Sequence, residues 1–236
     1  MSQLEVDKVI SQSGTTLTLG DSADTITIPS GATLDASNAT LTLPDDSVTT
    51  AKIDDGAVTN AKVDASAAIA TTKLGAGAVL QVVSTTKTDT YTEDILANTL
   101  STNLVTGLQP SITPSSASNK ILILITINVG YESNAVGDAA GFLLRRNSTG
   151  IAKGDTAGSR TSMTQLSWLG STDQMVSMSM NFLDSPNTTS STTYAISLFN
   201  GSGSARYVRI NRTDSDADAN YRARTVSTIT LMEIAG

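Results

Sequence analysis

The sequence predicts an all-β protein in which a repeat-containing N-terminal part precedes a C-terminal β-sandwich. Serine and threonine together make up 66 of the 236 residues, and threonine suits exposed strand faces because its branched Cβ fits a pleated surface. Leu, Ile and Val alternate with these residues in many short runs. The runs stop at Gly, Asp, Ser or Pro, as strands do before turns. These observations favour strands along most of the chain.

Residues 1–14 hold a short amphipathic segment. Its apolar positions are Leu4, Val6 and Val9 or Ile10, separated by polar and charged residues. A secretory leader would place a basic and then an apolar stretch here. This segment has acids instead, so we expect no signal peptide.

Short strands are expected one after another between residues 15 and 44. The runs TLTLG, TITIP, ATLD and ATLTLP combine threonine with Leu or Ile. Their apolar side chains are expected to share one face. Strands this short are not stable alone, because a small sheet needs a covered apolar face.

The stretch DSVTTAKIDDGAVTNAKVDASAAIATTKL, residues 46–74, contains three similar units at a spacing of ten or eleven residues. The units are VTTAKID, VTNAKVD and IATTKL. Its apolar spacings of three and two fit either a single helical turn or a kinked extended segment, and both interpretations stay open. A flexible low-complexity linker is the alternative, but linkers seldom keep branched residues in register. Each unit is too short to bury a core of its own, whereas three identical chains in a closed cyclic arrangement can share one.

We therefore predict a homotrimeric shaft over residues 15–78. The residues expected in its core are Leu17, Leu19, Ile26, Ile28, Leu34, Leu41, Leu43, Val48, Ile53, Val58, Val63, Ile69 and Leu74.

After the sequence Leu-Gly-Ala-Gly-Ala the expected strands become longer and the side chains larger, which predicts a head domain over residues 79–236. This region is long enough to bury a hydrophobic core. In QMVSMSMNF the apolar residues Val176, Met178, Met180 and Phe182 alternate with polar ones, which indicates a half-buried strand. Eight strands at regular spacing favour a β-sandwich of jelly-roll type. The expected strands are 79–85, 120–129, 141–146, 162–169, 174–183, 192–200, 205–212 and 225–234.

The composition excludes several functions. Cysteine and histidine are absent, so disulfides, zinc fingers and Ser-His-Asp catalysis are ruled out. The net charge of −7 argues against nucleic-acid binding. Residues 1–79 hold ten acids against four lysines, and all eight arginines come later, which suggests two regions with different tasks. The longest apolar run, ILILITINV, has about half the ~20 residues of a membrane-spanning helix, so we expect a core strand and no membrane insertion.

Two groups of acidic residues are candidates for sites. The loop from Asp214 to Asn220 starts like a calcium loop but has alanine and threonine where that loop needs glycine and glutamate, so a solvated acidic loop is favoured. Asp155, Asp173 and Asp184 could supply a glycosidase pair only if two of them converge. We therefore expect no enzyme, no metal and no cofactor.

Aromatic and basic side chains of the head could contact a host surface. Trp168 is expected either in the core or stacked on a sugar of a surface glycan, and the tyrosines 131, 194, 207 and 221 are considered with it. Arginine suits bidentate contacts, so the arginines are expected to pair with carboxylates across a trimer interface. The alternative is contact with an anionic surface polymer. The arginines are Arg145, Arg146, Arg206, Arg209, Arg222 and Arg224.

Three segments resemble one known family. They are FLLRRNSTGIAKGDTAGSRTSMT at 142–164, NFLDSPNTTSSTTYAISL at 181–198 and the ending INRTDSDADANYRARTVSTITLMEIAG. These segments are similar to a C-terminal domain of tail-fibre and other appendage proteins of tailed bacteriophages, especially marine ones. The repeat DDSVTTAKIDDGAVTNAKVD looks like the shaft repeats of such fibres, and SQLEVDKVI is similar to their virion-attachment segment.

The resemblance implies a structural virion protein, a homotrimeric tail fibre located on the phage particle and assembled in the bacterial cytoplasm. It implies attachment to other virion proteins through Leu4, Val6, Val9 and Ile10, and host-surface contact through the heads. A capsid decoration or head-fibre protein without a receptor role is the first alternative. A secreted carbohydrate-binding module and a glycan-cleaving enzyme are further rivals. The residues that contact a receptor are not identified.

Overall fold

The structure is a computed structural model. It describes residues 73–132, 138–168, 170 and 173–236, together with positions 25, 27–33, 35, 40, 42, 48, 49, 53, 57–59, 63 and 67. The chain divides into two compact units, Met1–Ala67 and Ala68–Gly236, which are treated separately below.

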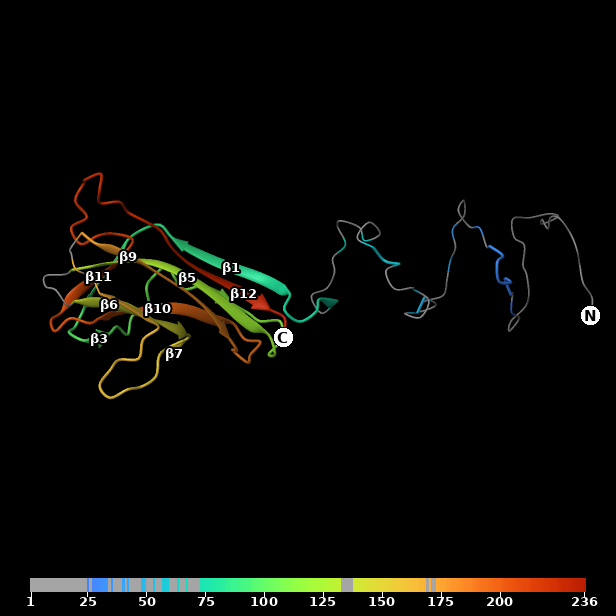
Figure 1. Cartoon of the computed structure of the whole chain (residues 1–236), viewed down its shortest axis with the longest axis horizontal. Coiled ribbons are helices and arrows are strands. Elements are labelled where there is room, and N and C mark those ends of the chain that lie inside the picture. The colour runs from blue at the N-terminus through green and yellow to red at the C-terminus, as the bar shows by residue number, and fades with distance from the viewer. Residues whose placement is uncertain are drawn as a thin grey trace, which may run out of the picture. The chain divides into compact units, whose positions relative to one another are not determined.

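The all-β prediction is confirmed. The described residues form twelve strands in two sheets, and the paired strands are antiparallel throughout (Figure 1). The strands are β1 (Val79–Lys87), β2 (Tyr91–Ile95), β3 (Thr99–Leu100), β4 (Ser111–Ile112), β5 (Lys120–Tyr131), β6 (Ala139–Arg146), β7 (Thr149–Ile151), β8 (Gln165–Trp168), β9 (Met175–Asp184), β10 (Thr192–Asn200), β11 (Arg206–Ile210) and β12 (Ser227–Ile234).

Strands that are distant in sequence are neighbours in both sheets. The first sheet follows the order β1-β12-β5-β11-β2, with β9 paired to the other side of β5. The second sheet follows β3-β10-β6-β7, with β4 on β10 and β8 on β6. The first and last strands of the unit, β1 and β12, therefore lie side by side over most of their length.

One hydrophobic core joins the two sheets. Every second residue of β5, from Ile121 to Tyr131, is buried, which is the period expected of a strand with one covered face. These side chains pack with Phe142 and Leu144 of β6 and with Ile196 of β10 from the second sheet. Fully burying a large aliphatic or aromatic side chain contributes about 1.5–3 kcal/mol, so this core is what makes the unit compact.

Each of the eight predicted strands overlaps a strand of the structure, and the prediction for 192–200 matches β10 at both ends. In β9 the apolar set with Met178 faces the core, while Ser177, Ser179 and Asn181 are exposed, as the alternation predicts. Four strands were not predicted: β2, β3, β4 and β7. Three of these have only two or three residues, and β2, with the sequence YTEDI, places two acids where an apolar alternation was sought.

The described positions between 25 and 67 show no helix or strand. Ile28, Val48, Ile53, Val58 and Val63 lie among them, and each has between 37% and 59% of its surface exposed. Leu74, which belongs to the second unit, is 41% exposed. The attachment residues Leu4, Val6, Val9 and Ile10, and the shaft residues Leu17, Leu19, Ile26, Leu34, Leu41, Leu43 and Ile69, lie outside the described residues.

Candidate functional site

The structure separates the aromatic side chains into two groups. Tyr131 and Tyr194 are fully buried, so they belong to the core and do not reach a surface ligand. Burial and the nearby carboxylate of Asp138 raise the pKa of Tyr131 to about 12, which keeps this core phenol neutral. Trp168 is 66% exposed. The alternative that placed this tryptophan in the core is therefore wrong.

Trp168 stands at the rim of a groove on the outer side of the second sheet. Strand β8 presents Leu166 and Trp168 on one exposed face, because alternate residues of a strand point to the same side. The floor is formed by Ala139 of β6 and Phe199 of β10, and both are almost fully buried. The groove has a volume of about 650 Å³, within the range of about 300–1,000 Å³ in which small-molecule sites fall.

Polar side chains line much of the rest of this groove, together with Met163 and Gly201. Asn98, Ser159, Arg160 and Thr161 contribute to it and are exposed. Among the described residues, Arg160 takes part in none of the ion pairs, and its guanidinium donates only a long hydrogen bond of 3.4 Å to the carbonyl of Ala157. An aromatic face beside hydroxyl, amide and guanidinium donors can stack on a sugar ring and hydrogen-bond its substituents.

The segment that forms one wall of the groove is tied to the sheet by its own hydrogen bonds. Within it the amide of Gly154 donates to the carbonyl of Met163 at 3.2 Å. Thr164 accepts from the amide of Leu144 at 2.8 Å and so fastens the end of the segment to β6. The groove is therefore shaped by a positioned loop on a rigid sheet, the arrangement in which loops most often carry binding sites.

Most of the arginines that were expected at a trimer interface pair with carboxylates of the same chain. Arg146 binds Asp184 at 2.9 Å and Arg206 approaches Asp138 at 3.5 Å. Arg145 has a different partner, the hydroxyl of Ser197, at 2.6 Å. The remaining pairs are Arg209 with Asp214, Arg222 with Asp173, and Arg224 with Asp216.

These pairings also account for the acidic loop from Asp214 to Asn220. Asp216 accepts hydrogen bonds from Arg224, the shorter of 2.7 Å, and lies 3.6 Å from Arg212. The hydrogen bond from Arg224 is the main reason that the pKa of Asp216 is lowered, and the charge of Arg212 adds to it. Within the described residues no group of three or more acidic side chains is arranged to hold a metal ion. The carboxylate of Asp216 is thus paired with arginine side chains.

The three carboxylates considered for glycan cleavage have separate surroundings. Asp184 is buried and accepts from Arg146 and from the phenol of Tyr194, at 2.9 and 2.6 Å. Burial and the bond to Asp184 raise the pKa of Tyr194, so this phenol remains a donor. Asp173 accepts from Arg222, and Asp155 is exposed in the loop after β7. The three carboxylates thus have different partners and exposures, and Asp184 stabilises buried polar groups of the head.

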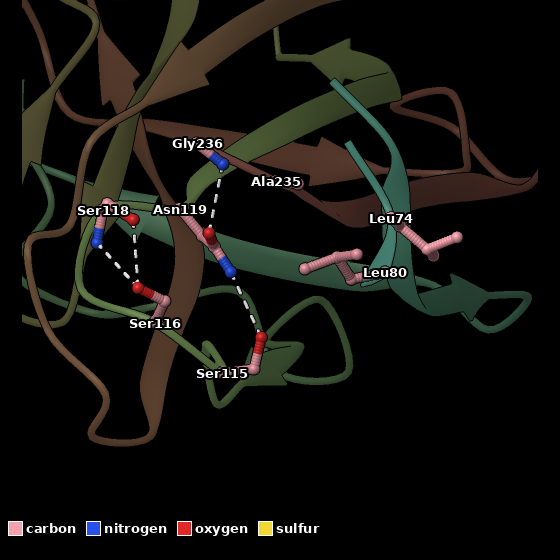
Figure 2. Close-up of a pocket in the computed structure, with 8 residues that line it drawn as sticks. All are labelled: Leu74, Leu80, Ser115, Ser116, Ser118, Asn119, Ala235 and Gly236. Atoms are coloured by element: carbon pink, nitrogen blue, oxygen red, sulfur yellow. Dashed lines mark hydrogen bonds between the residues drawn. The ribbon is translucent and has the colours of Figure 1, made fainter. Parts of the chain in front are cut away.

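A second hollow, of about 310 Å³, lies where the chain enters the second unit (Figure 2). Leu74 and Leu80 line one side of it, and the serine-rich loop 115–118 with Asn119 lines the other. The last residue, Gly236, donates its amide to the side chain of Asn119 at 3.1 Å. The amide of Gly77 also donates to the carbonyl of Ala235 at 2.8 Å, so the two ends of the unit are joined here.

A buried carboxylate, that of Glu233, holds this region together. It is 1% exposed and accepts from Gln81, Asn119 and both the amide and hydroxyl of Ser115, at 2.6–2.8 Å. Burial alone would raise the pKa of Glu233, but the hydrogen bonds from Asn119, Gln81 and Ser115 outweigh it and the pKa is lowered. The ionised carboxylate therefore ties β1, the 115–119 loop and β12 to one another.

No known protein-family profile matches the chain, and a search of curated proteins finds no relative. Within the described residues, no helix has the length and apolar character needed to cross a bilayer.

Proposed function

We propose that the protein is a non-enzymatic, homotrimeric virion appendage, a short tail fibre of a tailed bacteriophage. Its N-terminal segment attaches to the particle, residues 15–78 form an interlaced shaft, and the C-terminal β-sandwich is the head that contacts the host surface. The proposal rests on the resemblance of the fibre-like segments and on the exposure of apolar residues in the repeats.

That exposure is the observation that carries the proposal. Val48 and Val58 occupy the same position in two repeats, and they are 56% and 59% exposed. The described positions around them lie outside helices and strands, so in one copy these two branched side chains lie in water. Identical neighbouring chains in a closed three-fold arrangement would cover these positions with their own equivalents.

The sheet order supports a jelly-roll head. β1, β12, β5 and β9 are successive neighbours in one sheet, and β3, β10, β6 and β8 in the other. Antiparallel sheets whose neighbours come from opposite ends of the sequence are typical of the double-sheet jelly rolls found in capsid and lectin domains. Such a head presents loops and grooves on a rigid support.

The proposed mechanism is multivalent contact. The groove beside Trp168 and Arg160 is the part of the head best suited to bind a sugar. Three copies on one shaft raise the effective concentration of each further contact, which can strengthen weak binding by roughly 10²–10⁴. A fibre can therefore hold a surface firmly through sites that bind weakly one at a time.

Localisation on purified particles tests the role. Gold-labelled antibodies against the head should decorate the tail of particles of the phage that encodes the chain, in electron micrographs. Label confined to the capsid surface would support the decoration protein instead. If the antibody detects the denatured protein in the preparation but labels neither the tail nor the capsid of intact particles, both the tail-fibre and the decoration-protein assignments would be contradicted.

A further inference from the structure

The two sheets of the head differ in how their outer faces are covered. On the second sheet, outward side chains are buried: Ala139 is 2% exposed, Leu143 5% and Phe199 7%. The chain itself covers them, since Leu143 packs against Gly150 of β7, and Gly201 lies against Ala139 and Phe199. Over β6 and β10 the outer face of the second sheet is therefore largely covered within one copy, whereas β8 leaves Leu166 and Trp168 exposed beside the groove.

The first sheet presents an open outer face over β1, β12, β9 and the first half of β5. The pairing registers place Val82, Met232, Leu122 and Leu183 side by side in one row across these four strands. Val82 is 54% exposed and Leu183 is 48% exposed, whereas Met232 and Leu122 are half-buried between them. The row runs from β1 at one side of the sheet to β9 at the other.

Below this row the face carries Leu124, Asn181 and pairs of hydroxyl groups that bond to one another. Ser84 and Thr230 are 2.8 Å apart, and Thr126 and Ser179 are 3.1 Å apart. The chain closes the far end of the face, where a Cβ on Gly130 would lie 2.0 Å from the carbonyl oxygen of Arg212. What stays open is a bounded surface of apolar, hydroxyl and amide side chains, which we name the neutral face.

Charge distinguishes the neutral face from the rest of the molecule. The chain has 22 acidic and 15 basic residues. Among the described outward residues of the neutral face, only Lys120, at one end of β5, is charged. A surface that avoids charge in a chain of net charge −7 can meet its own copies without repulsion.

We propose that the neutral face is the contact by which the heads of three copies pack on one another. The inference rests on the homotrimer of the proposed function and adds a second interface to the one expected in the shaft. Around a three-fold axis each copy touches two neighbours. The apolar row spans the sheet, so Val82 at one end can contact one neighbour and Leu183 at the other end can contact the second.

The position of β1 favours the head of another copy as the partner of the neutral face. β1 is the first strand after the repeats, so chains that are joined through their repeats bring their β1 strands close together. Apolar, uncharged surface is what the centre of an interface between subunits requires. The buried carboxylate of Glu233 fixes β1 to β12 from the inner side, so both strands present the face as one rigid surface.

Cysteine accessibility in the full-length chain tests the proposal, because the chain has no cysteine of its own. Leu183→Cys and Val82→Cys place a thiol at either side of the neutral face. Leu96→Cys is the matched control, since Leu96 is 71% exposed and lies outside the face, between β2 and β3. The rate of modification by a bulky maleimide is measured alongside the mass of each variant in solution.

We expect the two face thiols to react about tenfold or more slowly than the control thiol in the three-chain assembly, and at equal rates once it is dissociated. A face variant that falls to the mass of one chain, while Leu96→Cys keeps the mass of three, also supports the contact. Equal rates in an intact three-chain assembly would overturn the contact and leave the homotrimer standing. A single-chain mass for the unmodified protein would overturn both.

Discussion

The repeats and the head use the same kinds of side chain with opposite results. Ile123 of the head is fully buried because β5 has strands on both sides and a second sheet across the core. Ile53 of the repeats is 40% exposed, and the described positions near it belong to no strand or helix. Apolar residues bury themselves only where the same chain supplies the opposing layer. The comparison shows that the core of the head is completed within one copy, whereas the described repeat residues stay exposed in one copy, and we propose that other copies cover them.

Matched cavity substitutions give the largest contrast between the two regions. Ile123→Ala should lower the free energy of unfolding of the head by about 2–5 kcal/mol, because it removes buried methyl groups and leaves a cavity. Val58→Ala should leave it within about 0.5 kcal/mol. Urea denaturation followed by far-UV circular dichroism measures both. Similar decreases in the free energy of unfolding for the two variants would show that the stability of the head depends on the repeats, which would contradict the difference drawn between the two regions.

A second substitution probes the polar interior of the head. Asp184→Asn should lower the free energy of unfolding by about 2–3 kcal/mol, because Arg146 and Tyr194 then lose a charged acceptor. Asp94→Asn on the exposed side of β2 is the control and should change little. Equal effects of both changes in urea titrations would contradict the role of Asp184.

The pH dependence of the head tests Glu233. Its pKa is lower in the folded than in the unfolded chain, whose ordinary value is 4.5. The stabilisation is therefore present above pH 4.5 and is lost as the pH falls through the folded pKa. Glu233→Gln should cost about 2 kcal/mol at neutral pH, because an amide nitrogen would face the donors that surround the carboxylate.

Glu233→Gln should also reduce the fall in melting temperature between pH 5 and pH 3, measured by differential scanning calorimetry. Asp155→Asn, in an exposed loop, is the control and should keep the wild-type slope. A slope that Glu233→Gln leaves unchanged would show that other carboxylates cause the acid sensitivity.

The smallest effect on stability and the clearest effect on binding are expected at the groove. Trp168→Ala should change the free energy of unfolding by no more than about 0.5 kcal/mol, since the side chain is 66% exposed. Binding of the full-length protein to host cells or to their extracted surface glycans should weaken about tenfold. Tyr221→Ala, at a residue 72% exposed, is the control. Equal binding by both variants would place the host contact elsewhere on the head.

The sequence was most informative where alternation is long. The runs around Ile123 and Met178 predicted β5 and β9, and in β9 the alternation also predicted the correct inner face, because the period of two is set by strand geometry alone. The short strands β3, β4 and β7 could not be predicted, since two or three residues show no period and pair only because a long neighbour is present. The Gly- and Ser-rich linker at 201–205 joins β10 and β11, which belong to different sheets, and its sequence alone does not distinguish such a crossover from a hairpin turn.

The groove was only partly visible in the sequence. Trp168 was a candidate, but alternation in β8 does not say which face the rest of the chain covers. Asn98, Arg160 and Phe199 come from three distant segments, and the sheet order alone brings them together. The ion pairs of Arg146 and Arg209 were likewise assigned to other copies, because the sequence separation of an arginine and its carboxylate carries no information about their distance in space.

The central claim is that the repeats are completed by identical chains, and the mass of the full-length protein in dilute solution tests it most directly. Sedimentation equilibrium should give about 73 kDa, three times the chain mass of 24.4 kDa, with no dependence on rotor speed. A mass of 24.4 kDa for a compact chain at the same concentration would contradict the account.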